Sequence, residues 1–109
     1  MKTLKLEPLR PHTARGFRYL AVPKELIKNR SYSPLDFGAI FLYARMMEIA
    51  TLSAQNEDKF TDKKGLFIIY TVERMEQDLQ RSHPTIVKWT KQLENIGLIE
   101  KVRQGQGKP

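Results

Sequence analysis

The sequence contains no cysteine and only two histidines among its 109 residues. Without cysteine the chain has no disulfide framework, no thiolate metal site and no cysteine nucleophile. It also lacks any run of about 18 apolar residues, and charges and prolines interrupt its N-terminus where a signal peptide has an apolar core. These absences exclude a disulfide-stabilised secreted protein and a helical membrane protein, and we expect a cytoplasmic protein.

Enzyme motifs are missing as well. The sequence shows no nucleophile elbow, no glycine loop that cradles a phosphate and no cluster of metal-ligating side chains. The acids of the polar stretch 53–64 do not alternate as the oxygen ligands of a calcium loop do. We therefore expect a protein without catalytic activity, bound metal or cofactor.

The charge is distributed unevenly along the chain, whose formal net charge is +7. Residues 1–30 carry eight basic and two acidic side chains and residues 81–109 carry six and two, whereas residues 31–80 carry five and eight. Basic ends around an acidic middle favour contact with a polyanion, because each cation placed on a phosphate releases counterions. The alternative is a solvated basic surface that has no partner.

The length and composition fit one small domain with a single core, since 40% of the 109 residues are hydrophobic. We expect residues 1–15 to be a flexible N-terminal arm and residues 16–109 to form the folded domain. The expected fold class is α+β and mainly α, because the helical patterns are long and the strand patterns are short.

The first half of this domain predicts a short N-terminal strand and one long helix. Residues 16–22 alternate in hydrophobicity as a strand does, and Pro23 suits the first turn of a short helix that follows. The pair Ser33-Pro34 has the residue types of a helix start, and the apolar stripe behind it predicts a central buried helix up to Leu52. The polar residues 53–64 then predict a surface loop.

The second half predicts a buried strand and two helices joined by a tight turn. The strand covers residues 66–70, which are apolar, β-branched or aromatic. Thr71 is placed to cap a helix that ends at Leu79, and Ser82 is placed to cap a second helix that ends before Gly97.

A strand over residues 98–102 and a glycine-rich turn at 104–107 follow the second helix. This order of elements is that of a winged helix-turn-helix domain, in which the second helix enters the major groove of DNA. The helical spacing places Lys88 and Lys91 on the outward side of that helix and its apolar residues on the inward side. The inward residues are Ile86, Trp89, Thr90, Leu93 and Ile96.

A helix that faces DNA needs polar and cationic side chains near its N-terminus, where the helix dipole favours phosphate. The candidate DNA-binding residues are Thr71, Arg81, Ser82, His83, Thr85, Lys88, Lys91, Arg103 and Lys108. Arg81, Lys91 and Lys108 are expected to contact phosphates. Arg103 is expected either on phosphate or in the minor groove. The alternative for the two helix lysines is an ordinary solvated face, and His83 either contacts DNA or packs on Pro84.

Several segments together resemble one known family. They are LAVPKELIKNRSYSPLDFGAIFLYARM, at residues 20–46, and the run that starts LFIIYTVERM and ends RQGQGKP, at residues 66–109. In order and spacing these segments resemble the N-terminal domain of the plasmid replication initiator protein A (RepA) family of Gram-positive bacteria. The resemblance covers roughly residues 16–109.

The resemblance implies a winged-helix domain that binds repeated sequences of a plasmid origin as a homodimer and marks the place where host replication proteins assemble. Ser82, Thr85 and Lys88 match the recognition-helix motif. The wing motif is matched by Arg103, Gly105, Gly107 and Lys108. The pair His83-Pro84 departs from the usual polar or charged pair, so the base contacts do not transfer. Family members continue into a returning wing strand and a C-terminal domain, so we expect a truncated C-terminal wing here.

Two other functions suit the same fold. A winged-helix transcriptional regulator binds an operator instead of an origin, and only the family resemblance separates these two functions. A winged-helix module of replisome assembly would contact proteins, and its basic ends would be incidental. A steep salt dependence of DNA binding indicates direct phosphate contacts, whereas a flat one favours the protein-interaction module.

Overall fold

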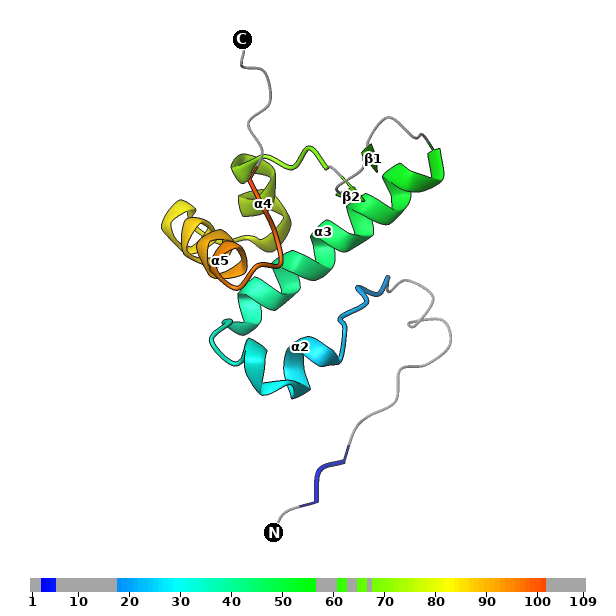
Figure 1. Ribbon diagram of the computed structural model, residues 1–109. Helices are drawn as coiled ribbons and strands as arrows, with labels where there is room; N and C mark the ends of the chain where they lie inside the picture. Colours follow the sequence, from blue (N-terminus) through cyan, green and yellow to red (C-terminus); the bar gives the residue numbers. More distant parts are fainter. Residues whose placement is uncertain (1–2, 6–17, 57–60, 63–64, 67, 102–109) are drawn as a thin grey trace.

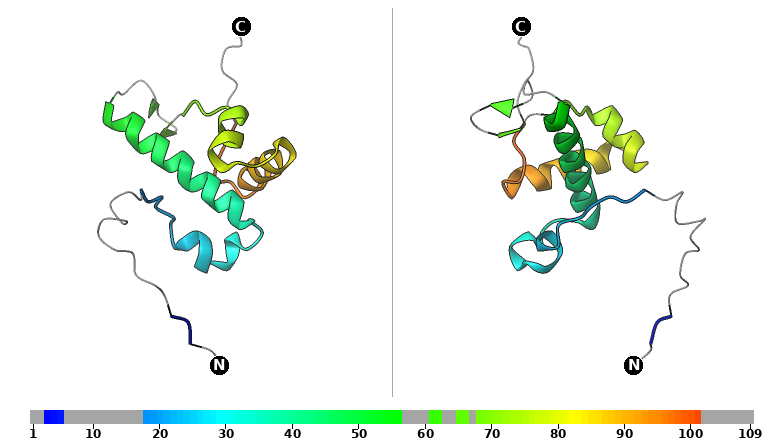
Figure 2. Two further views of the ribbon diagram at one scale, coloured as in Figure 1. Left: turned by 180° about the vertical axis from the view of Figure 1, so that it is seen from behind. Right: turned by 90° about the vertical axis from the view of Figure 1, so that its right-hand side faces the viewer.

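The computed structural model describes residues 3–5, 18–56, 61–62, 65–66 and 68–101. Their elements are, in chain order, α2 (Glu25–Lys28), the 3₁₀ helix η1 (Arg30–Tyr32), α3 (Phe37–Asn56), β1 (Thr61–Asp62), β2 (Gly65–Leu66), α4 (Val72–Leu79) and α5 (His83–Asn95). The long helix α3 runs through the middle, with α4 and α5 on one side and α2 near its N-terminal end (Figures 1 and 2).

The core lies where α4 and α5 pack on α3. From α3, Leu42 is fully buried, and from α5, Ile86 and Leu93 are fully buried against it. Met75 of α4 belongs to the same cluster. Burying a large aliphatic side chain contributes about 1.5–3 kcal/mol, so these contacts fix how α5 is rotated about its own axis. Within the described ranges, no helix combines the length and the apolar character needed to cross a membrane.

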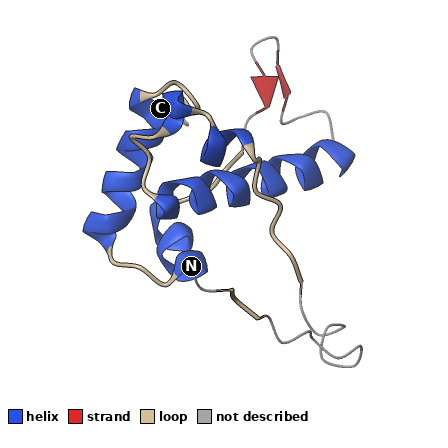
Figure 3. Ribbon diagram, turned by 90° about the horizontal axis from the view of Figure 1, so that it is seen from below, coloured by secondary structure: helices blue, strands red, loops and turns tan. Residues whose placement is uncertain are grey.

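The expected α+β class with an N-terminal strand is wrong for the described residues, whose fold is a helical, helix-turn-helix arrangement. Residues 18–22, 68–70 and 98–101 form no strand. A short strand is stable only when a neighbour satisfies its backbone groups, and these runs have no strand partner in the described part of the chain. The strands β1 and β2 have two residues each and pair as a small antiparallel hairpin (Figure 3). The predicted turn of the wing, at 104–107, lies outside the described residues.

The central helix is confirmed, but only one side of it is buried, since Phe37 and Phe41 are exposed, and both of its ends differ from the prediction. Helix α3 begins at Phe37 and not after Ser33. The reason is that Ser33 closes η1, where its N–H donates to the Arg30 carbonyl at 3.0 Å, and the chain turns there before α3 begins. The helix also continues to Asn56, through the first part of the predicted loop. That part is polar but contains no glycine or proline, the residues that most disfavour a helix.

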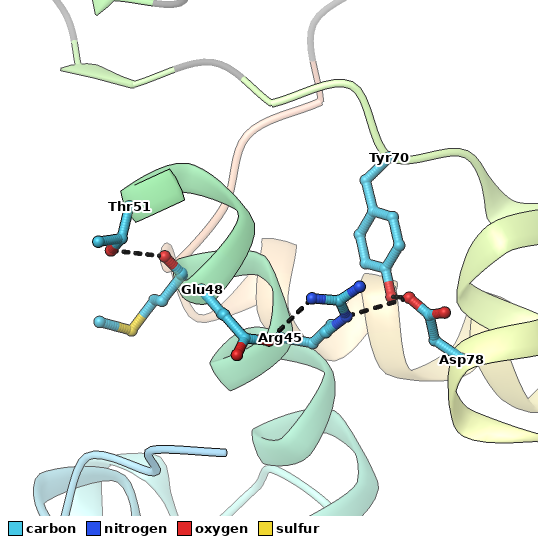
Figure 4. Close-up of polar contacts among 6 residues, drawn as sticks. Arg45, Glu48, Thr51, Tyr70 and Asp78 are labelled. Atoms are coloured by element: carbon cyan, nitrogen blue, oxygen red, sulfur yellow. Dashed lines mark hydrogen bonds and ion pairs between the residues drawn. The ribbon is translucent and has the colours of Figure 1, made fainter. Parts of the chain in front are cut away.

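A polar network joins α4 to α3 beside the core (Figure 4). The Asp78 carboxylate accepts from the Tyr70 hydroxyl at 2.6 Å and from Arg45 Nε at 3.1 Å. Arg45 Nη1 also donates to Glu48 Oε1 at 2.8 Å. The Tyr70 hydroxyl and then the Arg45 guanidinium hold the pKa of Asp78 below its usual value, whereas burial and the carboxylate raise the pKa of Tyr70. The ion pair between Asp78 and Arg45 therefore joins α4 to the middle of α3.

Helix α5 meets the first turn of α3 at Gly38. A Cβ atom on Gly38 would overlap the six-membered ring of the Trp89 indole. Glycine is therefore what lets this ring pack on the backbone of α3. The polar end of the indole is also satisfied, because Trp89 Nε1 donates to Asp36 Oδ2 at 3.2 Å.

Replacing Gly38 with alanine is expected to lower the free energy of unfolding by about 1–3 kcal/mol, the usual range for an overpacked core. Helix propensity alone predicts the opposite sign, since alanine is favoured over glycine by about 1 kcal/mol in a helix. Urea unfolding followed by circular dichroism measures the change, with Thr51→Ala at an exposed position of α3 as the control. A Gly38→Ala domain that matches or exceeds the wild-type stability contradicts the packing described above.

Candidate nucleic-acid interface

The predicted cap of α4 is confirmed. The Thr71 hydroxyl accepts from the Arg74 N–H at 3.2 Å, at an exposed helix start. The helix ends at Leu79, and the next residue, Gln80, has the left-handed backbone angles φ 53° and ψ 52°. The Arg81 N–H then returns to the Glu76 carbonyl at 3.2 Å, and this turn directs the chain into α5 within three residues.

Helix α5 starts after Ser82, as predicted, but the predicted side-chain cap is wrong. The Ser82 hydroxyl makes no capping bond to the helix backbone. It lies 3.0 Å from the Thr85 hydroxyl, so these two side chains satisfy each other. Pro84 occupies the first turn, where its missing N–H costs nothing.

The end of α5 follows the predicted glycine signal. Gly97 has the positive φ of 87° expected of a residue just past a helix end. The N–H of Leu98 donates to the Leu93 carbonyl at 3.0 Å, and the N–H of Gly97 donates to the Glu94 carbonyl at 3.1 Å. These two bonds are those of a Schellman motif, and they close the helix.

The two sides of α5 are divided as the sequence predicts. Ile86, Thr90 and Leu93 are buried, and the Thr90 hydroxyl is satisfied by the Val87 carbonyl at 2.9 Å. The exposed residues of the opposite side include Pro84, Lys88, Lys91 and Asn95. The outward side of α5 is therefore polar and cationic, and we call it the outer face of α5.

The two lysines of this face have different surroundings. Lys91 is exposed and makes no hydrogen bond or ion pair with the residues that the structure describes. The side chain of Lys88 is 64% exposed, and its Nζ lies 3.2 Å from Asp36 Oδ2. One cation is thus free for a ligand, whereas the other already has a carboxylate partner.

The turn between the two helices brings together two further candidate residues. Arg81 is exposed and its Nη1 donates to the Gln80 carbonyl at 2.8 Å. His83 Nδ1 lies 3.0 Å from Glu76 Oε2, so His83 of α5 is paired to α4 rather than packed on Pro84 alone. Two other candidates, Arg103 and Lys108, lie outside the described residues, and the structure does not relate them to the outer face of α5.

Sequence reasoning missed two residues of this region, Asp36 and Gln92. The Gln92 amide donates to Asp36 Oδ2 at 3.2 Å and accepts from the Asp36 N–H at 2.9 Å. The hydrogen bond from Lys88, and then that from Gln92, hold the pKa of Asp36 below its usual value. Because Asp36 and α5 are far apart in the chain, no local pattern could indicate the pair. The described residues contain no group of three or more side chains suited to hold a metal ion.

Two helices joined by a short turn, the second with lysines on its outer face, place this domain in the helix-turn-helix class. The chain belongs to the family of the replication initiator protein A (RepA) N-terminus, which matches residues 18–109. The family predicted from the sequence is thereby confirmed. At the level of the family, the predicted function of a DNA-binding replication initiator is confirmed as well. No curated protein matches the chain.

Three solved structures share the fold. One, described as the N-terminal domain of a DNA-binding protein, has a TM-score of 0.72 at 24% identity and covers 96% of this chain and 79% of its own. An MDR initiator has a TM-score of 0.65 at 29% identity, and the match covers 84% of this chain and 75% of the initiator chain. A chain of a Rep-DNA complex has a TM-score of 0.64 at 24% identity, and the match covers 84% of this chain and 73% of that one.

The left-handed residue of the turn gives a test of this geometry. Gln80→Gly is expected to raise the free energy of unfolding by up to about 1 kcal/mol, because a left-handed backbone costs a residue with a side chain roughly that amount. Gln80→Val is expected to lower it, since a β-branched side chain tolerates this conformation poorly. Thermal unfolding of both variants measures whether each substitution raises or lowers the stability. Equal effects of glycine and valine contradict the left-handed turn.

Proposed function

We propose that this domain binds double-stranded DNA sequence-specifically at repeated sites of a plasmid replication origin and so initiates replication of the plasmid. It acts in the cytoplasm, by binding and without catalysis. The observation that carries the proposal is the outer face of α5, where Lys88 and Lys91 lie one turn apart on a helix whose opposite side is buried. Membership in the RepA N-terminal family and the fold shared with a Rep-DNA complex support it.

The candidate residues divide between phosphate contacts and base contacts. Phosphate contacts fix the position of a protein on the duplex without reading sequence, and exposed Arg81, Lys91 and Thr71 suit that role. Base edges are read by side chains on the first turns of a recognition helix, which here include Lys88 and His83. Because Glu76 occupies His83 Nδ1, Nε2 is the remaining hydrogen-bonding atom of that ring.

We include a homodimer in the proposal, since repeated sites are commonly read by symmetric proteins. A strand over residues 16–22 could have paired with a second copy across a twofold axis, but residues 18–22 form no strand and give the dimer no support. Exposed Phe37 and Phe41, one turn apart on α3, offer an apolar surface for a second copy. Host replication proteins are the further expected partners. A monomer in sedimentation velocity runs across the concentrations used for DNA binding contradicts the dimer.

Two alternative functions, a transcriptional regulator and a protein-interaction module, can be distinguished from the proposed one. A transcriptional regulator would use the same outer face of α5 on an operator, and membership in an initiator family favours the origin. A module that only contacts proteins would not need the cationic outer face of α5. Salt dependence separates that module from both DNA-binding functions.

Fluorescence anisotropy on an origin-repeat duplex and on a shuffled duplex, over a salt series, tests the proposal. The repeat is expected to bind at least ~10³-fold more tightly. Lys88→Ala is expected to weaken binding to the repeat by about 1–3 kcal/mol and to reduce specificity, as the loss of a base contact does. Lys91→Ala is expected to weaken both duplexes and to lower the salt slope by about 1.

The control is Lys28→Ala, which removes an exposed lysine of α2, on the other side of α3 from α4 (Figure 1). It is expected to leave the specificity ratio unchanged. Equal, weak and salt-independent binding of both duplexes contradicts the proposal and favours the protein-interaction module.

A further inference from the structure

Asp36 gathers three hydrogen-bond donors of α5 on a single oxygen. Its Oδ2 lies 3.2 Å from Lys88 Nζ, 3.2 Å from Trp89 Nε1 and 3.2 Å from Gln92 Nε2. The three donors come from one side of α5, next to its outer face. A carboxylate is therefore positioned at the border of the surface that we propose to meet DNA.

The position of Asp36 explains why it stays ionised there. Asp36 directly precedes α3, and its carbonyl accepts from the Ile40 N–H at 3.2 Å, so it lies at the positive end of the α3 dipole. Its own N–H donates to Gln92 Oε1 at 2.9 Å, which holds its backbone against α5. The carboxylate is thus fixed by contacts that do not involve Lys88.

Lys88 differs from the other two donors in its exposure. Trp89 and Gln92 are partly buried in the packing of α5 on α3, whereas the Lys88 side chain is 64% exposed. An ammonium group has three N–H donors, and Asp36 accepts from only one of them. The pairing therefore offsets part of the positive charge of Lys88 and leaves two donors for another acceptor.

Phosphates and base edges respond differently to such a lysine. A phosphate is attracted mainly by charge, and this attraction is independent of sequence. A base edge presents neutral acceptors, such as O6 and N7 of guanine, which need a donor in a defined position. A lysine held and partly neutralised by a carboxylate therefore favours base edges over phosphates.

We propose that Asp36 is a specificity-determining residue, which holds Lys88 in place for a base contact and weakens its attraction to phosphate. This inference rests on the proposed function, because it concerns the same outer face of α5. Asp36 acts through Lys88 and is a positioning residue, since its own carboxylate accepts from α5 and needs no contact with DNA.

The first test is Asp36→Asn, which removes the charge and keeps an acceptor oxygen. Binding to the shuffled duplex is expected to strengthen, by up to about fivefold, as the loss of an exposed ion pair permits. Its salt slope is expected to steepen by about 0.9, as one more phosphate contact requires. Binding to the repeat is expected not to strengthen by the same factor, so the specificity ratio falls.

The matched control is Glu48→Gln. Glu48 is 43% exposed, as Asp36 is, and is also paired with a cation, but it lies in a later turn of α3 and pairs with Arg45. The variant changes the net charge by the same amount and is expected to leave the specificity ratio unchanged. In a Lys88→Ala background, Asp36→Asn is expected to change the binding of both duplexes alike and to leave the specificity ratio unchanged. An identical change in both duplexes for Asp36→Asn and Glu48→Gln overturns the inference.

A second comparison does not depend on the stability of Asp36→Asn. Lys88→Met and Lys91→Met remove the two neighbouring lysines of the outer face of α5, of which only Lys88 is paired. On the shuffled duplex, Lys91→Met is expected to lower the salt slope by about 0.9 and Lys88→Met to change it little. Equal losses of slope overturn the inference. A wild-type domain that binds neither duplex contradicts the proposed function instead.

Discussion

The contact between α5 and the N-terminal end of α3 is what the candidate interface depends on. Its apolar part is the Trp89 ring on Gly38, and its polar part is the set of bonds that Asp36 accepts. Both parts act on the middle of α5, at residues 88–92, while Ile86 and Leu93 bury its inner side. The outward direction of the lysines is therefore a consequence of packing, so the stability of the domain and the proposed DNA contact depend on the same residues.

The net charge of +7 says less about DNA binding than the partners of each cation do. Arg45 forms ion pairs with Asp78 and Glu48, and Lys88 forms one with Asp36. Lys91, in contrast, has no partner among the described residues and is available to a phosphate. An interface with one free and one partly neutralised lysine suits a protein that must reject most of the DNA it meets, because unpaired cations bind any duplex.

The helix-turn-helix unit could be predicted because its signals are local. The Thr71 cap and the left-handed Gly97 depend on a few neighbouring residues, and the inward side of α5 follows from helical spacing alone. The N-terminal strand was wrong because alternation does not supply a partner strand. The contacts of Asp36 with α5 were missed because they join segments that only the folded chain brings together.

The most direct test of the central claim, that the outer face of α5 meets DNA, is a titration of the ¹⁵N-labelled domain with an origin-repeat duplex, followed by amide chemical shifts. The account predicts the largest changes from Arg81 to Lys91, with smaller ones at Thr71. Changes confined to the exposed apolar side of α3, around Phe37 and Phe41, with α5 unaffected, would contradict it.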